Sequence, residues 1–141
     1  MVIVPESATD AEIIAAVEGW LRLLECEDYD AAAAEIDSPP GGVWTAELLR
    51  HCVNYHGYSD RNEHRVTLTG ASRDRVIGGR VLVDIQRKEV DRVAEPNDGG
   101  ELHDVWYDLC IDGMMSDQTA TFRLVRVPQG LALRLYDICV R

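Results

Sequence analysis

The amino-acid sequence predicts an α+β fold in which N-terminal helices pack on a curved, mainly antiparallel sheet of four to five strands. Apolar residues recur with helical spacing up to about residue 56, and they alternate with polar residues from about residue 66 onward. Because all predicted helices precede the strands, the order is typical of the α+β class. The 141 residues, 46% of them apolar, suffice for one core, so we expect a single domain spanning residues 1–141.

The first predicted helix begins after Thr9, which forms a capping-box pattern with Glu12. An apolar stripe follows at helical spacing: Ile13, Ile14, Val17, Trp20, Leu21 and Leu24. We expect Trp20, in the middle of this stripe, to pack against the sheet, and Glu18 to lie on the exposed acidic face.

Two shorter helices are expected before the first strand. Residues 28–36 form an alanine-rich segment with acids in its first turn, and "SPPGG" at residues 38–42 ends it. Residues 43–56 then place an apolar set on one helical face: Trp44, Leu48, Leu49, Cys52 and Val53.

Strands are predicted at residues 66–69, 81–86, 105–112, 119–127 and 131–140, with a polar loop at 95–101. The apolar residues of the last strand change parity near Leu135, which predicts a β-bulge there. Within "DLCIDGMMSDQ" (108–118), Asp108, Asp112 and Gly113 partly fit a calcium-binding loop. Because position 3 is the thiol of Cys110 and position 12 is not Glu, the "DG" pair instead predicts a hairpin.

The charge distribution limits the classes of partner. Formal net charge is −11, and residues 1–47 contain eleven acids against one arginine, for a balance of −10. This field repels phosphate backbones and anionic lipid, so we expect no nucleic-acid and no membrane partner. It is compatible with simple solubility or with a basic protein partner. The start of the chain lacks the features of a secretory signal, and a cytoplasmic location is expected.

The sequence contains few motifs that indicate a chemical activity. The four cysteines are far apart, lie inside predicted helices or strands, and are interpreted as small buried hydrophobes. No dinucleotide, phosphate-loop or zinc motif is present, so no cofactor and no metal is predicted.

A few titratable residues remain as candidates. Residues 50–64 are rich in histidine and tyrosine, and His51 is the candidate proton acceptor there, although the end of a helix explains this composition equally well. Asp84, Asp108 and Asp137 lie in predicted strands. The alternation places Asp84 and Asp108 on the solvent side, whereas the side of Asp137 stays open.

The order of elements resembles the cone-shaped (cystatin-like) α+β superfamily that includes nuclear transport factor two, polyketide cyclases and ketosteroid isomerases. The resemblance is carried by the helical segment 10–36 and by the strands "DVWYDLCIDG", "TATFRLVRV" and "LALRLYDICV". It implies a pocket between sheet and helices and a homodimer formed through the sheet. No acid–base dyad of the enzymes in this superfamily matches residue by residue.

We therefore expect non-catalytic binding of a small apolar molecule or a protein partner in or around a cone-shaped pocket, by a homodimer. The first alternative is a lyase, isomerase or hydrolase that uses Asp137 or His51 as proton acceptor and Tyr107 or Tyr136 as hydrogen-bond donor. The second alternative is an acidic inhibitor or immunity-type protein. A shared enclosed cavity would favour the enzyme.

Overall fold

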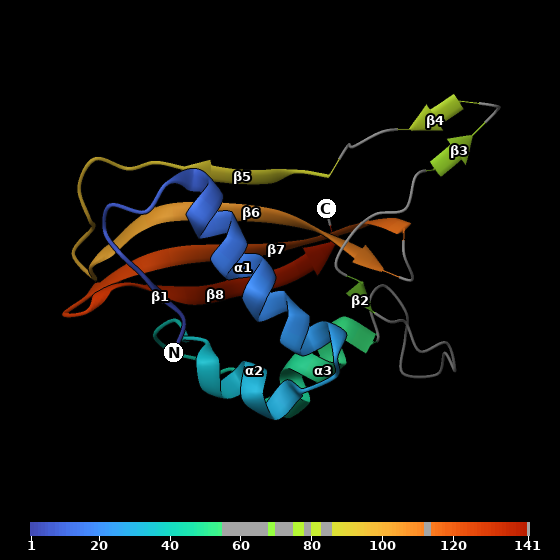
Figure 1. Cartoon of the computed structure of the whole chain (residues 1–141). Coiled ribbons are helices and arrows are strands. Elements are labelled where there is room, and N and C mark those ends of the chain that lie inside the picture. The colour runs from blue at the N-terminus through green and yellow to red at the C-terminus, as the bar shows by residue number, and fades with distance from the viewer. Residues whose placement is uncertain (55–67, 70–74, 78–79, 83–85, 112–113, 141) are drawn as a thin grey trace.

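A computed structural model of the protein describes residues 1–54, 68–69, 75–77, 80–82, 86–111 and 114–140. Its helices are α1 (Asp10–Glu25), α2 (Tyr29–Glu35) and α3 (Ala46–Asn54). Its strands are β1 (Ile3–Val4), β2 (Leu68–Thr69), β3 (Arg75–Ile77), β4 (Arg80–Leu82), β5 (Lys88–Asp91), β6 (Glu101–Ile111), β7 (Met114–Val127) and β8 (Gly130–Val140). Figure 1 shows α1 lying across one face of the long strands.

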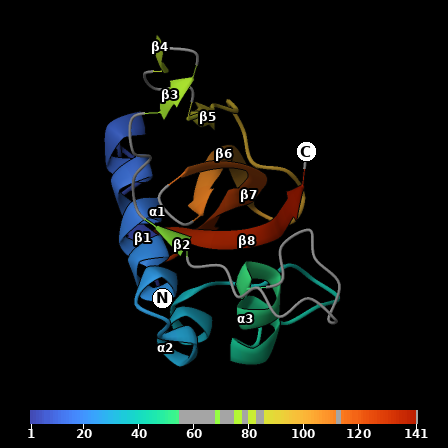
Figure 2. The ribbon, with the colours of Figure 1, turned by 90° about the vertical axis from the view of Figure 1, so that its right-hand side faces the viewer.

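Six strands form one antiparallel sheet that is five positions wide. Its order is β1-β8-β7-β6, and β2 and β5 share the far edge of β6 at different heights. The sheet curls, as the view in Figure 2 shows. Strands β3 and β4 form a separate two-stranded sheet. The predicted α+β arrangement of helices on a curved antiparallel sheet is confirmed.

Helix α1 begins and packs as its sequence predicts. Thr9 and Glu12 form both hydrogen bonds of the capping box. Five of the six stripe residues are buried, and Ile14 is partly buried. The Trp20 indole is 1% exposed, contacts the Phe122 ring edge-on at a centroid distance of 5.7 Å, and donates to the carbonyl of Ala32 at 3.0 Å. Trp20 therefore joins α1, α2 and the sheet at one point.

The free edge of β8 is closed by segments from the first third of the chain. Strand β1 pairs with its first residues. Farther along, the Leu133 amide donates to the carbonyl of Val2, and the Leu135 amide donates to that of Asp37. The Trp44 indole, just before α3, donates to the Leu135 carbonyl at 2.8 Å. These bonds satisfy backbone groups that an edge strand otherwise leaves open.

The turn between β7 and β8 requires glycine. Gly130 has φ +144°, and a Cβ atom placed on it would lie 2.4 Å from the carbonyl oxygen of Val4. Such a separation is shorter than any real contact, so a side chain here would displace β1 from the edge of β8.

The start of α1 is tied to the sheet by polar contacts around Arg92 and His103. The Arg92 guanidinium donates to the Asp10 carboxylate at 2.7 Å and to the Ala8 carbonyl at 2.8 Å. The buried His103 ring accepts from the Val93 amide through Nδ1. Burial and the neighbouring Arg92 charge lower the pKa of His103, so the ring stays neutral at pH 7.

Several sequence expectations need correction. Leu48 was expected on the buried face of the third helix together with Leu49 and Val53; these two are buried, but Leu48 is 43% exposed because it lies at the margin of that face. Cys26 was expected to be buried, yet it caps the exposed end of α1. Cys110 is buried as expected, whereas Cys52 is only partly covered.

Strand boundaries differ as well. Strands β1, β3 and β5 were not predicted, because each is too short for a clear alternation. Within the predicted strand at 66–69 only β2 lies among the described residues, and of 81–86 only 81–82 in β4 and residue 86 do. Asp84 and the segment 55–64, with His56 and His64, lie outside the described residues.

In the part of the chain that the structure describes, no helix has the length and apolar character needed to cross a bilayer.

We predict that Trp20→Ala lowers the free energy of unfolding by about 3–5 kcal/mol, because it leaves a cavity and removes the indole hydrogen bond. Urea melts monitored by circular dichroism measure the change. Glu25→Ala is the control, since Glu25 lies exposed at the end of the same helix, and its effect should stay within about 0.5 kcal/mol. Equal midpoints for the two variants would mean that the docking of α1 is wrong.

Candidate functional site

The structure separates the four candidate residues. Tyr107 lies on the inner face of the sheet, against α1, whereas Tyr136 and Asp137 lie on the outer face, where they line one groove. His51 is exposed in the last turn of α3. An enzymatic site that combines Asp137 with Tyr107 would therefore need groups that lie on opposite faces of the sheet. Only Asp137 and Tyr136 share a site.

Tyr107 is part of a contact that supports the fold. Its hydroxyl donates to the Glu18 carboxylate at 2.8 Å, and the Lys88 ammonium lies 3.1 Å from the same oxygen. Burial and the Glu18 charge raise the pKa of Tyr107 above its ordinary value. Glu18, which the sequence placed on a freely exposed face, is thus half-buried and bonded to the sheet. The reason for the error is that β5, which supplies Lys88, was not predicted.

A β-bulge brings Tyr136 and Asp137 to the outer face together. Phe122 pairs with Leu135, whereas Thr121 pairs with Asp137, so Tyr136 is the extra residue of β8. The parity change near Leu135 predicted this bulge, and the prediction is confirmed. The bulge interrupts the alternation that would otherwise send successive side chains to opposite faces.

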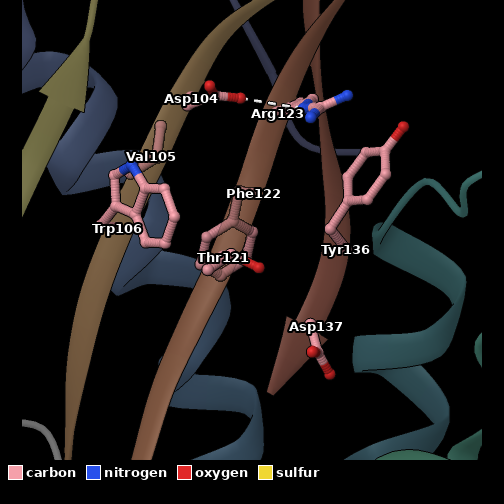
Figure 3. A pocket seen from close by; sticks show the side chains of 8 residues that line it. All are labelled: Asp104, Val105, Trp106, Thr121, Phe122, Arg123, Tyr136 and Asp137. Atoms are coloured by element: carbon pink, nitrogen blue, oxygen red, sulfur yellow. Dashed lines mark hydrogen bonds and ion pairs between the residues drawn. The ribbon is translucent and has the colours of Figure 1, made fainter. Parts of the chain in front are cut away.

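The groove is a hollow of about 170 Å³ on the face of the sheet opposite α1. Figure 3 shows Trp106 from β6 and Tyr136 from β8 standing on either side of Thr121 from β7. The lining residues are Asp104, Val105, Trp106, Thr121, Phe122, Arg123, Tyr136 and Asp137. Carboxylates lie toward both ends, with Asp104 at the end where it pairs with Arg123 and Asp137 at the other. We call this hollow the outer groove.

One end of the outer groove is fixed by the carboxylate of Glu101. One of its oxygens accepts from Asn97 at 3.0 Å and from Arg123 at 3.1 Å. The other accepts from Arg134 at 3.3 Å and from the Tyr136 hydroxyl. The Glu101 side chain is only 10% exposed, so these donors replace most of its contact with water. The four donors come from the loop before β6 and from strands β7 and β8.

Electrostatics agree with this geometry. Burial alone would raise the pKa of Glu101, but the hydrogen bonds from Tyr136, Asn97 and Arg123 outweigh it and lower the pKa to about 2. Burial and the Glu101 carboxylate together raise the pKa of Tyr136. At neutral pH Glu101 is thus a fixed anion and Tyr136 a fixed donor, so this pair organises the site rather than exchanging protons.

Arginine side chains stack on both aromatic walls. The Arg123 guanidinium lies 4.5 Å from the centroid of Tyr136, and that of Arg87 lies 5.0 Å from the centroid of Trp106. Arg123 also binds the Asp104 carboxylate at 2.9 Å. These contacts hold the walls of the outer groove in place.

The stretch 108–118 forms a hairpin, since Ile111 of β6 pairs with Met114 of β7. Residues 112–113 themselves lie outside the described residues. Asp108 was expected to face solvent, but its side chain is 20% exposed and accepts hydrogen bonds from the Arg87 amide and the Thr119 hydroxyl. Burial raises the pKa of Cys110, which keeps this thiol protonated. Asp108 therefore supports the sheet.

Two further hollows have a different character. One of about 220 Å³ adjoins the outer groove across the Asp104–Arg123 pair and is lined also by Val93 and Glu95. Another, of about 420 Å³, lies between the start of α2 and α3, where acids predominate. Neither has two aromatic walls. Among the described residues, no three potential metal-ligating side chains come together.

No family model, no curated protein and no solved structure matches the chain. The function of the site is therefore argued from its geometry. The superfamily suggested by the order of elements is neither supported nor contradicted by these comparisons. Sequence reasoning identified Tyr136 and Asp137 but missed Glu101, Trp106 and Arg123. These three residues lie on the neighbouring strands β6 and β7, but their proximity can be inferred only once the register of those strands is known.

We predict that Glu101→Gln lowers the free energy of unfolding at pH 7 by on the order of 2–3 kcal/mol, because Arg123 and Arg134 lose their shared anion. The pKa of Glu101 is lowered by folding, so its contribution is present above the unfolded pKa and is lost as the pH falls through about 5 to 2. Urea melts across this range should show the difference from wild type shrinking. A difference independent of pH would contradict the assigned role, and Glu95→Gln, at an exposed loop residue, should change little.

Proposed function

We propose that the protein is a non-catalytic binding domain and that the outer groove is its binding site. The observation that carries this proposal is a hollow with two aromatic walls whose polar groups are already held in place by the Glu101 contacts. A site organised before binding loses less conformational entropy when its guest arrives, which favours affinity. Binding sites typically combine apolar or aromatic walls with a few fixed polar groups, as here.

The size of the outer groove limits its guest. Pockets for drug-sized molecules are typically about 300–1,000 Å³, whereas the outer groove is about 170 Å³ and open on one side. It therefore suits a small molecule or one chemical group of a larger partner. The guest lies against the outer face of the sheet, away from the core that α1 covers.

The fold supports this arrangement from behind. The inner face of β6 and β7 directly behind the groove is filled by buried side chains, among them Val105, Phe122 and Trp20. The two aromatic walls therefore stand on strands whose other face is tightly packed. Sites on such a scaffold are held more rigidly than sites on loops.

The proposal predicts that small probes perturb the outer face of the sheet. Choline, benzamidine, benzoate, glucose and indole would each be titrated into ¹⁵N-labelled protein while amide resonances are followed. At least one probe should shift the amides of Thr121, Arg123 and Tyr136, and Trp106→Ala should weaken that binding by about tenfold because an aromatic wall is lost.

Val43→Ala is the control, since Val43 is a 76% exposed apolar residue that does not line the groove. A folded Trp106→Ala protein that keeps wild-type binding would overturn the assignment of the site. So would shifts confined to the residues around α2 and α3.

A further inference from the structure

Among the residues that the structure describes, the charged groups of the outer groove leave one carboxylate without a cationic partner. Arg123 is engaged by Asp104 and by Glu101, at 2.9 and 3.1 Å. Asp137 is exposed, and among the described residues no arginine or lysine lies within ion-pair distance of it. The pKa of the Cys52 thiol on α3 is raised mainly by burial and, in addition, by the negative charge of Asp137. A cation that enters the groove would find this carboxylate at one end.

The carboxylates next to the outer groove add further negative charge. Arg134 binds Asp37 and Glu101, so it is already shared between two acids. With Asp104 and Asp137, four carboxylates thus stand against the two guanidinium groups of Arg123 and Arg134. The third guanidinium group, that of Arg87 over Trp106, lies 4.0 Å from the carboxylates of both Glu89 and Asp108, so it does not cancel this surplus. The surplus of negative charge favours a positively charged guest over a neutral or anionic one.

The aromatic walls suit the same kind of guest. A cation is attracted to the face of an indole or phenol ring, and Trp106 and Tyr136 already bind the guanidinium groups of Arg87 and Arg123 in this way. The volume of about 170 Å³ admits a compact cationic group but not a large ring system. Size, charge and wall chemistry therefore agree.

We propose that the guest of the outer groove is an organic cation, a quaternary ammonium or guanidinium group that lies between Trp106 and Tyr136 with its charge toward Asp137. This proposal rests on the assignment of the groove as a binding site and names the chemistry that the groove selects. The cation belongs either to a free small molecule or to a basic side chain of a partner protein.

The test compares choline with 3,3-dimethyl-1-butanol, its neutral isostere, by titration calorimetry and by amide shifts at Thr121 and Tyr136. Choline should bind about tenfold more tightly than the alcohol. Asp137→Asn, which keeps the shape of the side chain, should remove most of this preference while it leaves binding of the alcohol unchanged. Asp98→Asn, at an exposed loop residue outside the groove, should keep it.

A second arm identifies the source of the cation. Ethylguanidinium and the capped peptide acetyl-Gly-Arg-Gly-amide carry the same group in free and peptide form. Tighter binding of the peptide would assign the groove to a side chain of a partner, and equal binding would assign it to a small molecule.

Two negative outcomes separate the proposals. If choline and its neutral isostere bind equally, and both shift the groove amides, the cation preference is wrong while the binding site stands. If neither these four probes nor benzamidine, benzoate, glucose and indole shift those amides, the binding site itself is wrong.

Discussion

The arrangement of side chains on the outer face of this protein depends on the hydrogen bonds that the Glu101 carboxylate accepts. This carboxylate accepts hydrogen bonds from the loop before β6, from Arg123 on β7 and from Arg134 and Tyr136 on β8. A carboxylate that is 10% exposed would be costly to bury alone, and the four donors offset that cost. They also set where the Arg123 and Tyr136 side chains lie. The outer groove is therefore a consequence of how Glu101 is satisfied.

The inner face of the sheet, against α1, is stabilised instead by the burial of apolar side chains. Trp20 joins α1 and α2 to Phe122 on β7, and the first third of the chain closes the edge of β8 through Val2, Asp37 and Trp44. This division leaves the outer face to polar and aromatic side chains. Asp37 connects the two systems, because its backbone pairs with β8 while its carboxylate binds Arg134.

The parts of the fold that repeat a simple pattern could be predicted from the sequence. The capping box at Thr9, the buried stripe around Trp20, the hairpin after Ile111 and the bulge at Tyr136 all follow from spacing and parity. Strand β5 was missed, and with it the contact of Lys88 with Glu18 and Tyr107. Four residues give too short an alternation, and their partners are far away in sequence.

The candidate site was predictable only in part for the same reason. Asp137 and Tyr136 could be chosen because acids and tyrosines in strands are conspicuous, but Tyr107 was grouped with them although it faces α1. Glu101, at the end of a polar loop, carries no local signal, since its donors lie 4 to 35 residues away. The contacts that define the groove arise from strand register, which the sequence did not reveal.

We infer that Glu101 holds Arg123 and Arg134 rigid before any guest arrives. The most direct measurement is ¹⁵Nε relaxation of the arginine side chains at neutral pH. The account predicts order parameters near those of rigid backbone, about 0.8, for Arg123 and Arg134, and values below about 0.6 for the exposed Arg22. Glu101→Gln should lower the first two toward the third. Arg123 and Arg134 side chains as mobile as Arg22 in the wild-type protein would contradict this role of Glu101.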